Sequence, residues 1–152
     1  MVMTITHTVG IKRSSEDVFA FLSDFSNDPQ WRANVVEMRA IGVESELGGI
    51  WSRQVEVRKV PGRIVETVAI ITSFEFPRRL TVQRASGPIR PAATYELEEH
   101  SGETLLRFRL DVSLTGMSIL LRPLVALFLA RIVRPSLEPD FGRLKEILEN
   151  ME

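Results

Sequence analysis

The C-terminal stretch of the chain reads Ser136-Leu-Glu-Pro-Asp-Phe-Gly-Arg-Leu-Lys-Glu-Ile-Leu-Glu149. Its apolar side chains recur at intervals of four, three and four residues, which is the spacing of one face of an α-helix: Leu137, Phe141, Leu144 and Leu148. Charged residues fill the opposite face. Ser136 is a candidate N-cap, and Pro139 would then fall in the first turn, where a proline removes no intrahelical hydrogen bond. The spacing predicts an amphipathic helix over 137–149, against which the rest of the chain packs.

The segment before this helix, 119–133, is apolar on nearly every side. Arg122 and Arg131 interrupt it, and it is shorter than the roughly 20 apolar residues that span a bilayer. A straight helix from 117 to 150 would measure about 50 Å, against a radius of gyration of about 15 Å for a compact chain of this length. We therefore expect Pro135 and Pro139 to break the helix. Three interpretations of 119–133 stay open: core, a homodimer surface, or a gate beside a cavity that also touches membranes.

Between these helical segments and the N-terminus, the sequence alternates apolar and polar residues and is punctuated by turns such as Val60-Pro-Gly62 and His100-Ser-Gly102. This pattern is typical of antiparallel strands joined by short connections. Strict alternation makes 4–11 a strand as well. We expect seven strands, at 4–11, 35–43, 48–59, 63–74, 78–86, 92–100 and 103–114. The clearest inward-facing positions are Leu80, Val82, Tyr95, Leu97, Leu106, Phe108, Leu110 and Val112.

Two short helices are predicted after the first strand. Ser14-Ser-Glu-Asp17 matches a capping box, and four apolar residues follow at helical spacing: Val18, Phe21, Leu22 and Phe25. The sequence Asn27-Asp-Pro29 then forces a turn. A second, brief helical turn is expected at 30–32, with Trp31 as its buried anchor.

Composition excludes several classes of function. The 152 residues, 44% hydrophobic and 26% charged, fit one globular domain over 1–152. A net charge of −1 gives no general attraction to nucleic acid, although sixteen of the nineteen basic residues are arginine. There is no cysteine, and there are only two histidines, so we expect neither a metal site nor a disulfide. No phosphate-binding or dinucleotide motif is present, so no cofactor is expected. The N-terminus lacks signal-peptide features, and we expect a cytoplasmic protein.

Four local motifs carry a resemblance to a known family. They are Ser15-Glu-Asp-Val-Phe-Ala-Phe-Leu-Ser-Asp24 with Trp31, Phe74-Glu-Phe-Pro-Arg-Arg-Leu80, Thr94-Tyr-Glu-Leu97 leading into Gly102-Glu-Thr104, and Phe141-Gly-Arg-Leu-Lys-Glu-Ile-Leu148. In this order the chain resembles the START-like helix-grip (SRPBCC) superfamily, nearest its polyketide cyclase/dehydrase branch. The resemblance implies an α+β fold: a seven-stranded curved antiparallel sheet wrapped around a long C-terminal helix, with two short helices after the first strand. It also implies a cavity between sheet and helix.

The sequence offers candidate residues for that cavity. The ligand-binding candidates are Phe21, Phe25, Trp31, Arg84, Tyr95, Phe108, Leu124 and Phe128. His7 and Glu66 are weaker candidates for acid–base catalysis, because His7 shares a strand face with apolar residues. Glu56 is a further candidate in the sheet. The competing interpretations are an ion pair for Arg84, a core tyrosine for Tyr95, and a solvent-facing position for Glu56 and Glu66.

Three hypotheses of function follow, and the third is an interaction module whose apolar segment, 119–133, binds a partner. In the first, the protein binds a hydrophobic or amphipathic small molecule, such as a lipid, isoprenoid or aromatic polyketide, in the cavity. In the second, it is a cyclase or dehydratase, in which Arg84 and Tyr95 polarise a carbonyl group and His7 or Glu66 moves a proton.

Overall fold

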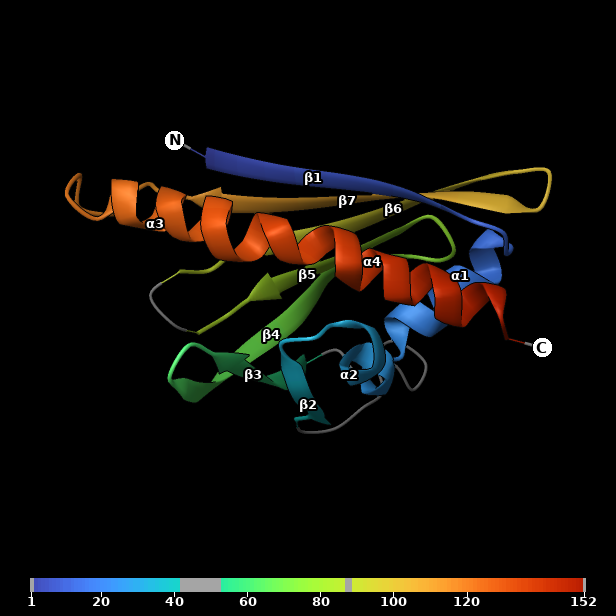
Figure 1. Ribbon diagram of the computed structural model, residues 1–152, viewed down its shortest axis with the longest axis horizontal. Helices are drawn as coiled ribbons and strands as arrows, with labels where there is room; N and C mark the ends of the chain where they lie inside the picture. The colour runs from blue at the N-terminus through green and yellow to red at the C-terminus, as the bar shows by residue number, and fades with distance from the viewer. Residues whose placement is uncertain (1, 42–52, 87–88, 152) are drawn as a thin grey trace.

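The computed structural model describes residues 2–41, 53–86 and 89–151. Within them the chain forms a seven-stranded sheet in the order β1-β7-β6-β5-β4-β3-β2, and every neighbouring pair is antiparallel. Strands β2 to β7 form a meander, and β1 joins its end beside β7 (Figure 1). The strands are β1 (Val2–Ile11), β2 (Val35–Ala40), β3 (Arg53–Val60), β4 (Arg63–Glu75), β5 (Arg79–Arg84), β6 (Ala92–His100) and β7 (Glu103–Ser113).

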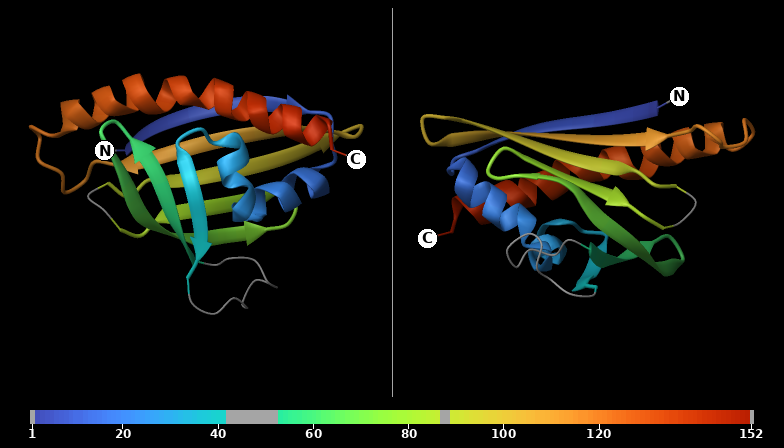
Figure 2. Two further views of the ribbon diagram at one scale, coloured as in Figure 1. Left: turned by 60° about the horizontal axis from the view of Figure 1, so that its bottom comes forward. Right: turned by 180° about the vertical axis from the view of Figure 1, so that it is seen from behind.

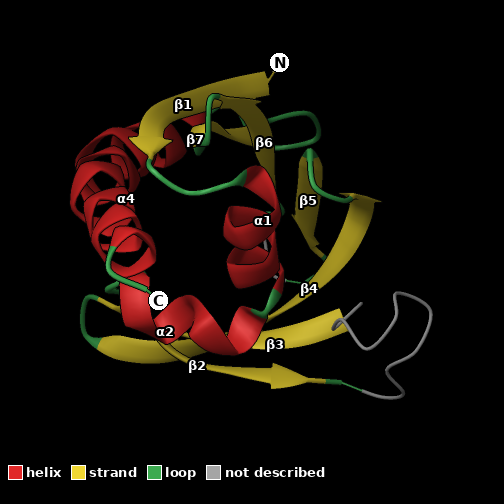
Figure 3. Cartoon of the chain, turned by 90° about the vertical axis from the view of Figure 1, so that its right-hand side faces the viewer, coloured by secondary structure: helices red, strands yellow, loops and turns green. Residues whose placement is uncertain are grey.

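The helices occur at two places in the chain. Between β1 and β2 lie α1 (Ser15–Ser23), a 3₁₀ turn (Phe25–Asn27) and α2 (Asp28–Trp31); after β7 lie α3 (Arg122–Phe128), a π-helical turn (Leu129–Val133) and α4 (Arg134–Glu149). The sheet curls around α4, and α1 and α2 pack inside the curl, as the end-on view shows (Figure 3). The expected α+β helix-grip architecture is confirmed.

The core lies between the concave face of the sheet and α4. The four residues predicted to form the buried face of the helix are all at most 8% exposed: Leu137, Phe141, Leu144 and Leu148. The ring of Phe141 lies 5.2 Å from those of His7, Trp31 and Phe108, so one helix residue joins β1, α2 and β7. Trp31 is 2% exposed, which confirms its expected role as a buried anchor.

Hydrogen bonds also hold α4 in place. Lys145 Nζ donates to the carbonyl oxygen of Gly10 at 2.6 Å, and Arg143 Nε donates to that of Trp31 at 3.1 Å. The first bond ties the helix to β1 and the second ties it to α2. At the start of α1, Ser14 Oγ accepts a hydrogen bond from the backbone N–H of Asp17 at 3.2 Å, so the predicted N-cap is present.

The predicted break in the C-terminal helix is wrong. α3, the π-helical turn and α4 follow one another without interruption from Arg122 to Glu149, a length of about 40 Å, along the longest axis of the molecule (Figures 1 and 2). The break was expected because a rounded molecule of this size could not hold so long a straight helix, and the molecule is in fact elongated. Pro135 follows the wider π-helical turn, and both Pro135 and Pro139 are exposed, so the carbonyl groups that lose a donor can bind water. Ser136 is not an N-cap, because its Oγ donates to the Val133 carbonyl at 2.6 Å.

Some predicted element boundaries also differ. The second helical turn begins at Asp28 instead of 30, and β2 ends at Ala40 instead of 43. The predicted strand 48–59 appears as β3 from Arg53, and the expectations for 42–52 lie outside the described residues. Among the residues that are described, no helix is both long enough and apolar enough to cross a membrane.

Candidate ligand-binding cavity

A cavity of about 300 Å³ lies between the concave face of the sheet and the C-terminal helix. Its apolar wall comes from β5, β6, β7 and the helix: Val82, Ala93, Leu110, Val112, Phe128, Leu129, Val133 and Leu137. Its polar wall comes from α2, β3, β4, β5 and α4: Asp28, Arg32, Gln54, Glu56, Arg58, Thr67, Arg84 and Asp140. The cavity is therefore amphipathic, with its charges gathered on one side.

Glu56 is the centre of the charged wall. One of its carboxylate oxygens, Oε1, lies 2.6 Å from Arg32 Nη2, and the other, Oε2, lies 2.5 Å from Arg84 Nη2. Arg32 also binds Asp28 Oδ2 at 3.0 Å through its other terminal nitrogen. The side chains of Asp28 and Glu56 are each only 5% exposed. A chain of alternating charges thus runs from α2 across the inside of the sheet.

The strand register explains how Arg84 reaches Glu56 across an intervening strand. Glu56 on β3 pairs with Thr67 on β4, and Arg84 on β5 pairs with Ala69, two residues further along β4. Residues two apart on a strand point to the same face, so both β4 side chains face the cavity. Because the side chain of Ala69 is a single methyl group, the long Arg84 side chain can pass over β4.

The surroundings displace the pKa values of the two carboxyl groups in opposite directions. Burial alone would raise the pKa of Glu56, but the positive charges of Arg32, Arg84 and Arg58 outweigh it and lower that pKa to about 2. For Asp28 burial dominates and raises the pKa to about 7, although Arg32 opposes the increase. Glu56 is therefore ionised at neutral pH, whereas Asp28 exchanges a proton near neutrality.

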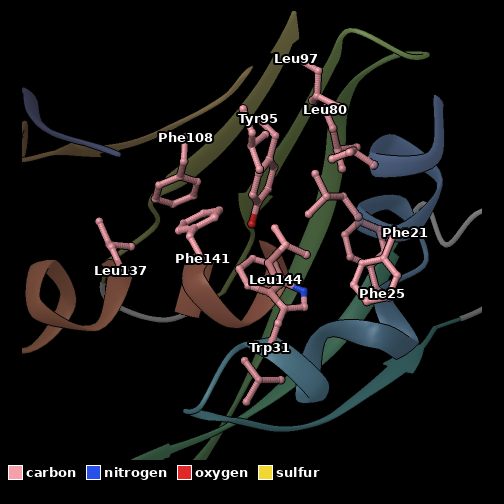
Figure 4. Close-up of a cluster of buried hydrophobic side chains, with 14 of the residues drawn as sticks. Phe21, Phe25, Trp31, Leu80, Tyr95, Leu97, Phe108, Leu137, Phe141 and Leu144 are labelled. Atoms are coloured by element: carbon pink, nitrogen blue, oxygen red, sulfur yellow. The ribbon is translucent and has the colours of Figure 1, made fainter. Parts of the chain in front are cut away.

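Two other cavity residues, Arg58 and Tyr95, each keep a single charge state at neutral pH. Burial and the nearby charge of Arg32 lower the pKa of Arg58 to about 10, so Arg58 remains a cation at neutral pH. Burial raises the pKa of Tyr95, which therefore keeps its hydroxyl proton. Figure 4 shows the Tyr95 ring extending from its strand into the interior, with the hydroxyl at its inner end.

Three polar atoms on the charged wall have no hydrogen-bond partner in the described part of the protein. They are Gln54 Oε1, Arg58 Nε and Thr67 Oγ1, and all three atoms are buried. Gln54 and Arg58 lie on the same face of β3 as Glu56, and Gln54 is only 1% exposed. Buried polar atoms without partners cost free energy, on the order of 1–3 kcal/mol each. The wall therefore offers a donor, an acceptor and a hydroxyl group to a molecule in the cavity.

The cavity brings together six of the predicted ligand-binding residues: Phe25, Trp31, Arg84, Tyr95, Phe108 and Phe128. The other two do not line it, since Phe21 is buried in the core and Leu124 is 62% exposed on the outside of α3. Their roles in binding remain predictions.

The weaker catalytic candidates also lie outside the cavity lining. His7 stacks on Phe141, and Glu66 is an exposed residue that binds Arg39 at 2.6 Å. The solvent-facing interpretation holds for Glu66 but is wrong for Glu56, which is 4% exposed. Arg84 forms an ion pair with Glu56, as the alternative to a ligand-binding role predicted.

Sequence reasoning missed Asp28, Arg32 and Arg58. Asp28 and Arg32 could have been found from their spacing, because opposite charges four residues apart in a helical turn can form an ion pair. The signal on β3 was the set Gln54, Glu56 and Arg58, which alternates with two valines and so shares one face. Alternation on a strand usually means that the valines face the interior and the charged residues face solvent. On β3, in contrast, the polar residues Gln54, Glu56 and Arg58 line the cavity.

Residues 3–149 match the model of a family described as polyketide cyclase/dehydrase and lipid transport. No curated protein sequence matches the chain significantly.

Three solved structures have a similar fold. The Zhui aromatase/cyclase from Streptomyces sp. R1128 is 12% identical with a TM-score of 0.79, over 98% of this chain and 94% of that one. A protein from Thermus thermophilus is 15% identical with a TM-score of 0.75, over 96% and 97% of the two chains. A START superfamily protein from Mycobacterium smegmatis is 18% identical with a TM-score of 0.66, over 95% and 98%. At these identities the likeness concerns the fold.

Proposed function

The chain belongs to the polyketide cyclase/dehydrase and lipid transport family, and we propose that it binds an amphipathic small molecule in the cavity. The apolar body of the ligand, of lipid, isoprenoid or aromatic polyketide type, would lie against β6, β7 and the helix. Its polar group would meet the charged wall. The observation that carries the proposal is the set of buried, unpartnered polar atoms on that wall: Gln54 Oε1, Arg58 Nε and Thr67 Oγ1.

The size of the cavity favours a small ligand. Binding sites for small molecules usually measure roughly 300–1,000 Å³, and this cavity of about 300 Å³ is at the lower end of that range. A single ring system or a medium-length chain fits such a volume better than a membrane phospholipid does.

The charge of the wall favours a ligand whose polar group accepts hydrogen bonds. Arg32, Arg58 and Arg84 line the cavity together with three carboxylates, and two of these, Asp28 and Glu56, pair with Arg32 and Arg84. The third lining carboxylate, Asp140, is engaged by Arg143 and by the backbone N–H of Ala33. An excess of guanidinium groups in a buried site favours a carboxylate, phenolate or carbonyl oxygen.

The test compares matched probes and matched variants. Decanoic acid and decanol differ only in the polar group, and we expect the acid to shift the amide NMR spectrum and the melting temperature at lower concentration. Ala93→Phe, which places a ring inside the cavity, should abolish both shifts. Ala92→Phe is the control, because Ala92 precedes it on β6 and points to the other face of the sheet.

Two results would contradict binding in the cavity. The first is that Ala93→Phe binds the probe as well as the unmodified protein does. The second is that neither probe, nor 1-naphthoic acid as an aromatic alternative, shifts any signal. A higher affinity for the alcohol would contradict the proposed role of the arginines while leaving cavity binding in place.

Asp28 favours a second candidate function, proton transfer at a carbon next to a carbonyl group. A carboxyl group with a pKa of about 7 in a buried site is suited to general acid–base catalysis at neutral pH. In this proposal the Asp28 carboxylate takes the proton, and Arg84 or the Tyr95 hydroxyl stabilises the negative charge that develops on the carbonyl oxygen. Asp28 thus replaces His7 and Glu66 as the proposed proton carrier.

Solvent deuterium exchange into 2-decanone, followed by NMR, tests this candidate. We expect the protein to accelerate exchange at the carbons beside the carbonyl group, and Asp28→Asn to remove the acceleration. Glu66→Gln should retain it, because Glu66 lies outside the cavity. Undiminished exchange by Asp28→Asn would exclude Asp28 as the base.

A further inference from the structure

The α3 end of the C-terminal helix carries an unusually exposed apolar surface. We name it the apolar tip, and it consists of Ile119, Leu120, Leu121, Leu124, Leu127 and Phe128, which are 41–84% exposed. Figures 1 and 2 show this end projecting past the sheet at one extremity of the molecule. Large apolar residues gathered on one exposed surface usually mark a contact with another molecule or with a membrane.

The apolar tip is not required to hold α3 on the protein. Val125 and Leu129 perform that task, since they are 8% and 4% exposed and belong to the hydrophobic core. Leu124 and Leu127 lie on another side of α3 and are 62% and 52% exposed, and the exposed Leu120 and Leu121 directly precede the helix. A helix with one apolar side packed inward and a second apolar side open to the surroundings can contact two apolar environments at once.

Charge identifies the second environment. From Val112 to Leu137 the chain has no acidic residue and no lysine, but it has Arg122, Arg131 and Arg134. Arg131 and Arg134 are exposed and lie about 15–20 Å along the helix from Leu121. A tip that enters the outer part of a bilayer by roughly 5–10 Å would place these arginines near the lipid headgroups. We propose that the apolar tip docks the protein on membranes that contain anionic lipids.

A symmetric dimer through the same surface is disfavoured. It would place two copies of a basic segment against each other, and the segment provides no carboxylate to compensate its arginines. Anionic lipid headgroups supply the missing negative charge, and each nearby arginine would strengthen binding about fivefold.

The position of the tip has a consequence for the cavity. Phe128 belongs to the tip and also lines the cavity, and its neighbour Leu129 lines the cavity as well. Docking would therefore place the bilayer against the cavity wall formed by these residues, where an apolar ligand could pass between membrane and protein. The docking itself does not depend on any ligand, so it is tested without one.

Vesicle flotation provides the test. The vesicles are phosphatidylcholine alone, or phosphatidylcholine with about 30 mol% phosphatidylglycerol. We expect binding to the anionic vesicles, weakening as salt is added. Leu120→Glu/Leu124→Glu should abolish it. Arg131→Gln/Arg134→Gln should weaken it by roughly 25-fold, because two arginine contributions are lost. Ile64→Glu, at a 64% exposed apolar residue of β4, is the control and should bind normally.

The outcomes separate the candidate occupants of the tip. Equal binding of the tip variant and the control, or equal binding to both vesicle types, would overturn the proposal. A dimer that light scattering detects in the unmodified protein but not in Leu120→Glu/Leu124→Glu, without vesicle binding, would also overturn it in favour of self-association. All altered residues are exposed, and circular dichroism verifies that each variant is folded.

Discussion

Replacing Asp28 by asparagine should stabilise the protein, and the gain should grow as the pH rises. Burial raises the pKa of Asp28 from 3.8 to about 7. The folded state therefore holds a proton that the unfolded state releases between these two values. Stability consequently falls as the pH rises from about 4 to about 7 and changes no further above that range. Asparagine is neutral at every pH and escapes this loss.

The size of the effect follows from the displacement of the pKa. Each pKa unit corresponds to about 1.4 kcal/mol, so the wild-type protein should lose roughly 3 kcal/mol of unfolding free energy between pH 5 and pH 8 through this group. Asp28 is 4% exposed, so solvent screening reduces the effect little. For a chain of this length the advantage of the variant at pH 8 corresponds to roughly 6–12 °C in Tm.

Urea unfolding at pH 5, 6, 7 and 8, followed by circular dichroism, measures this difference. The control is Asp24→Asn, because Asp24 is an exposed helix cap on the same segment and asparagine caps equally well. We expect the Asp24 variant to follow the wild-type pH profile. A stability difference between Asp28→Asn and the wild-type protein that is the same at pH 5 and pH 8 would contradict the raised pKa of Asp28.

Three further predictions concern stability. Glu56→Gln should cost about 3–5 kcal/mol near pH 7, because it leaves the guanidinium groups of Arg32 and Arg84 buried without their carboxylate. Because the pKa of Glu56 is lowered to about 2, this loss of unfolding free energy should be complete above about pH 4.5 and shrink as the pH falls toward 2. A loss that is unchanged at about pH 2.5 in urea titrations would contradict the lowered pKa. Phe141→Ala should cost about 3–5 kcal/mol in chemical unfolding, because its ring lies 5.2 Å from three other rings and 6.5 Å from that of Tyr95. A loss below about 1 kcal/mol would mean that the ring is not central to the core. Ser14→Ala should cost about 1 kcal/mol through loss of the N-cap of α1, and Ser14→Asp should restore it; equal stability of both variants in thermal unfolding would argue against the cap.

The elements predicted well from the sequence are those whose pattern depends on one surface only. On β7, four residues in alternate positions face the interior as expected: Leu106, Phe108, Leu110 and Val112. On α4, the spacing of Leu137, Phe141, Leu144 and Leu148 alone identified the face that the sheet covers. Because an apolar side chain needs only the absence of water, its direction can be inferred without knowledge of its partner.

The charged wall could not be predicted in the same way. A buried carboxylate is acceptable only where positive charges meet it, and those charges come from distant segments: Arg32 from the C-cap of α2 and Arg84 from β5. The alternation on β3 fixed which residues share a face, but it could not decide which face was inside. The same limit applied to the C-terminal helix, because its prolines end a helix only where the missing hydrogen bonds cannot be replaced by water.

Local periods of apolar residues were enough to identify the strands, their order along the chain and the amphipathic C-terminal helix, whereas the helix-grip fold class was implied by the resemblance of four motifs to a known family. Three properties arise from tertiary contacts: Glu56 faces inward, the pKa of Asp28 is raised to about 7, and α3 continues the helix past the sheet with its leucines exposed. These properties depend on distances between groups that are remote in sequence. Burial, charge pairing and exposure arise when the chain is folded, so they cannot be read from neighbouring residues.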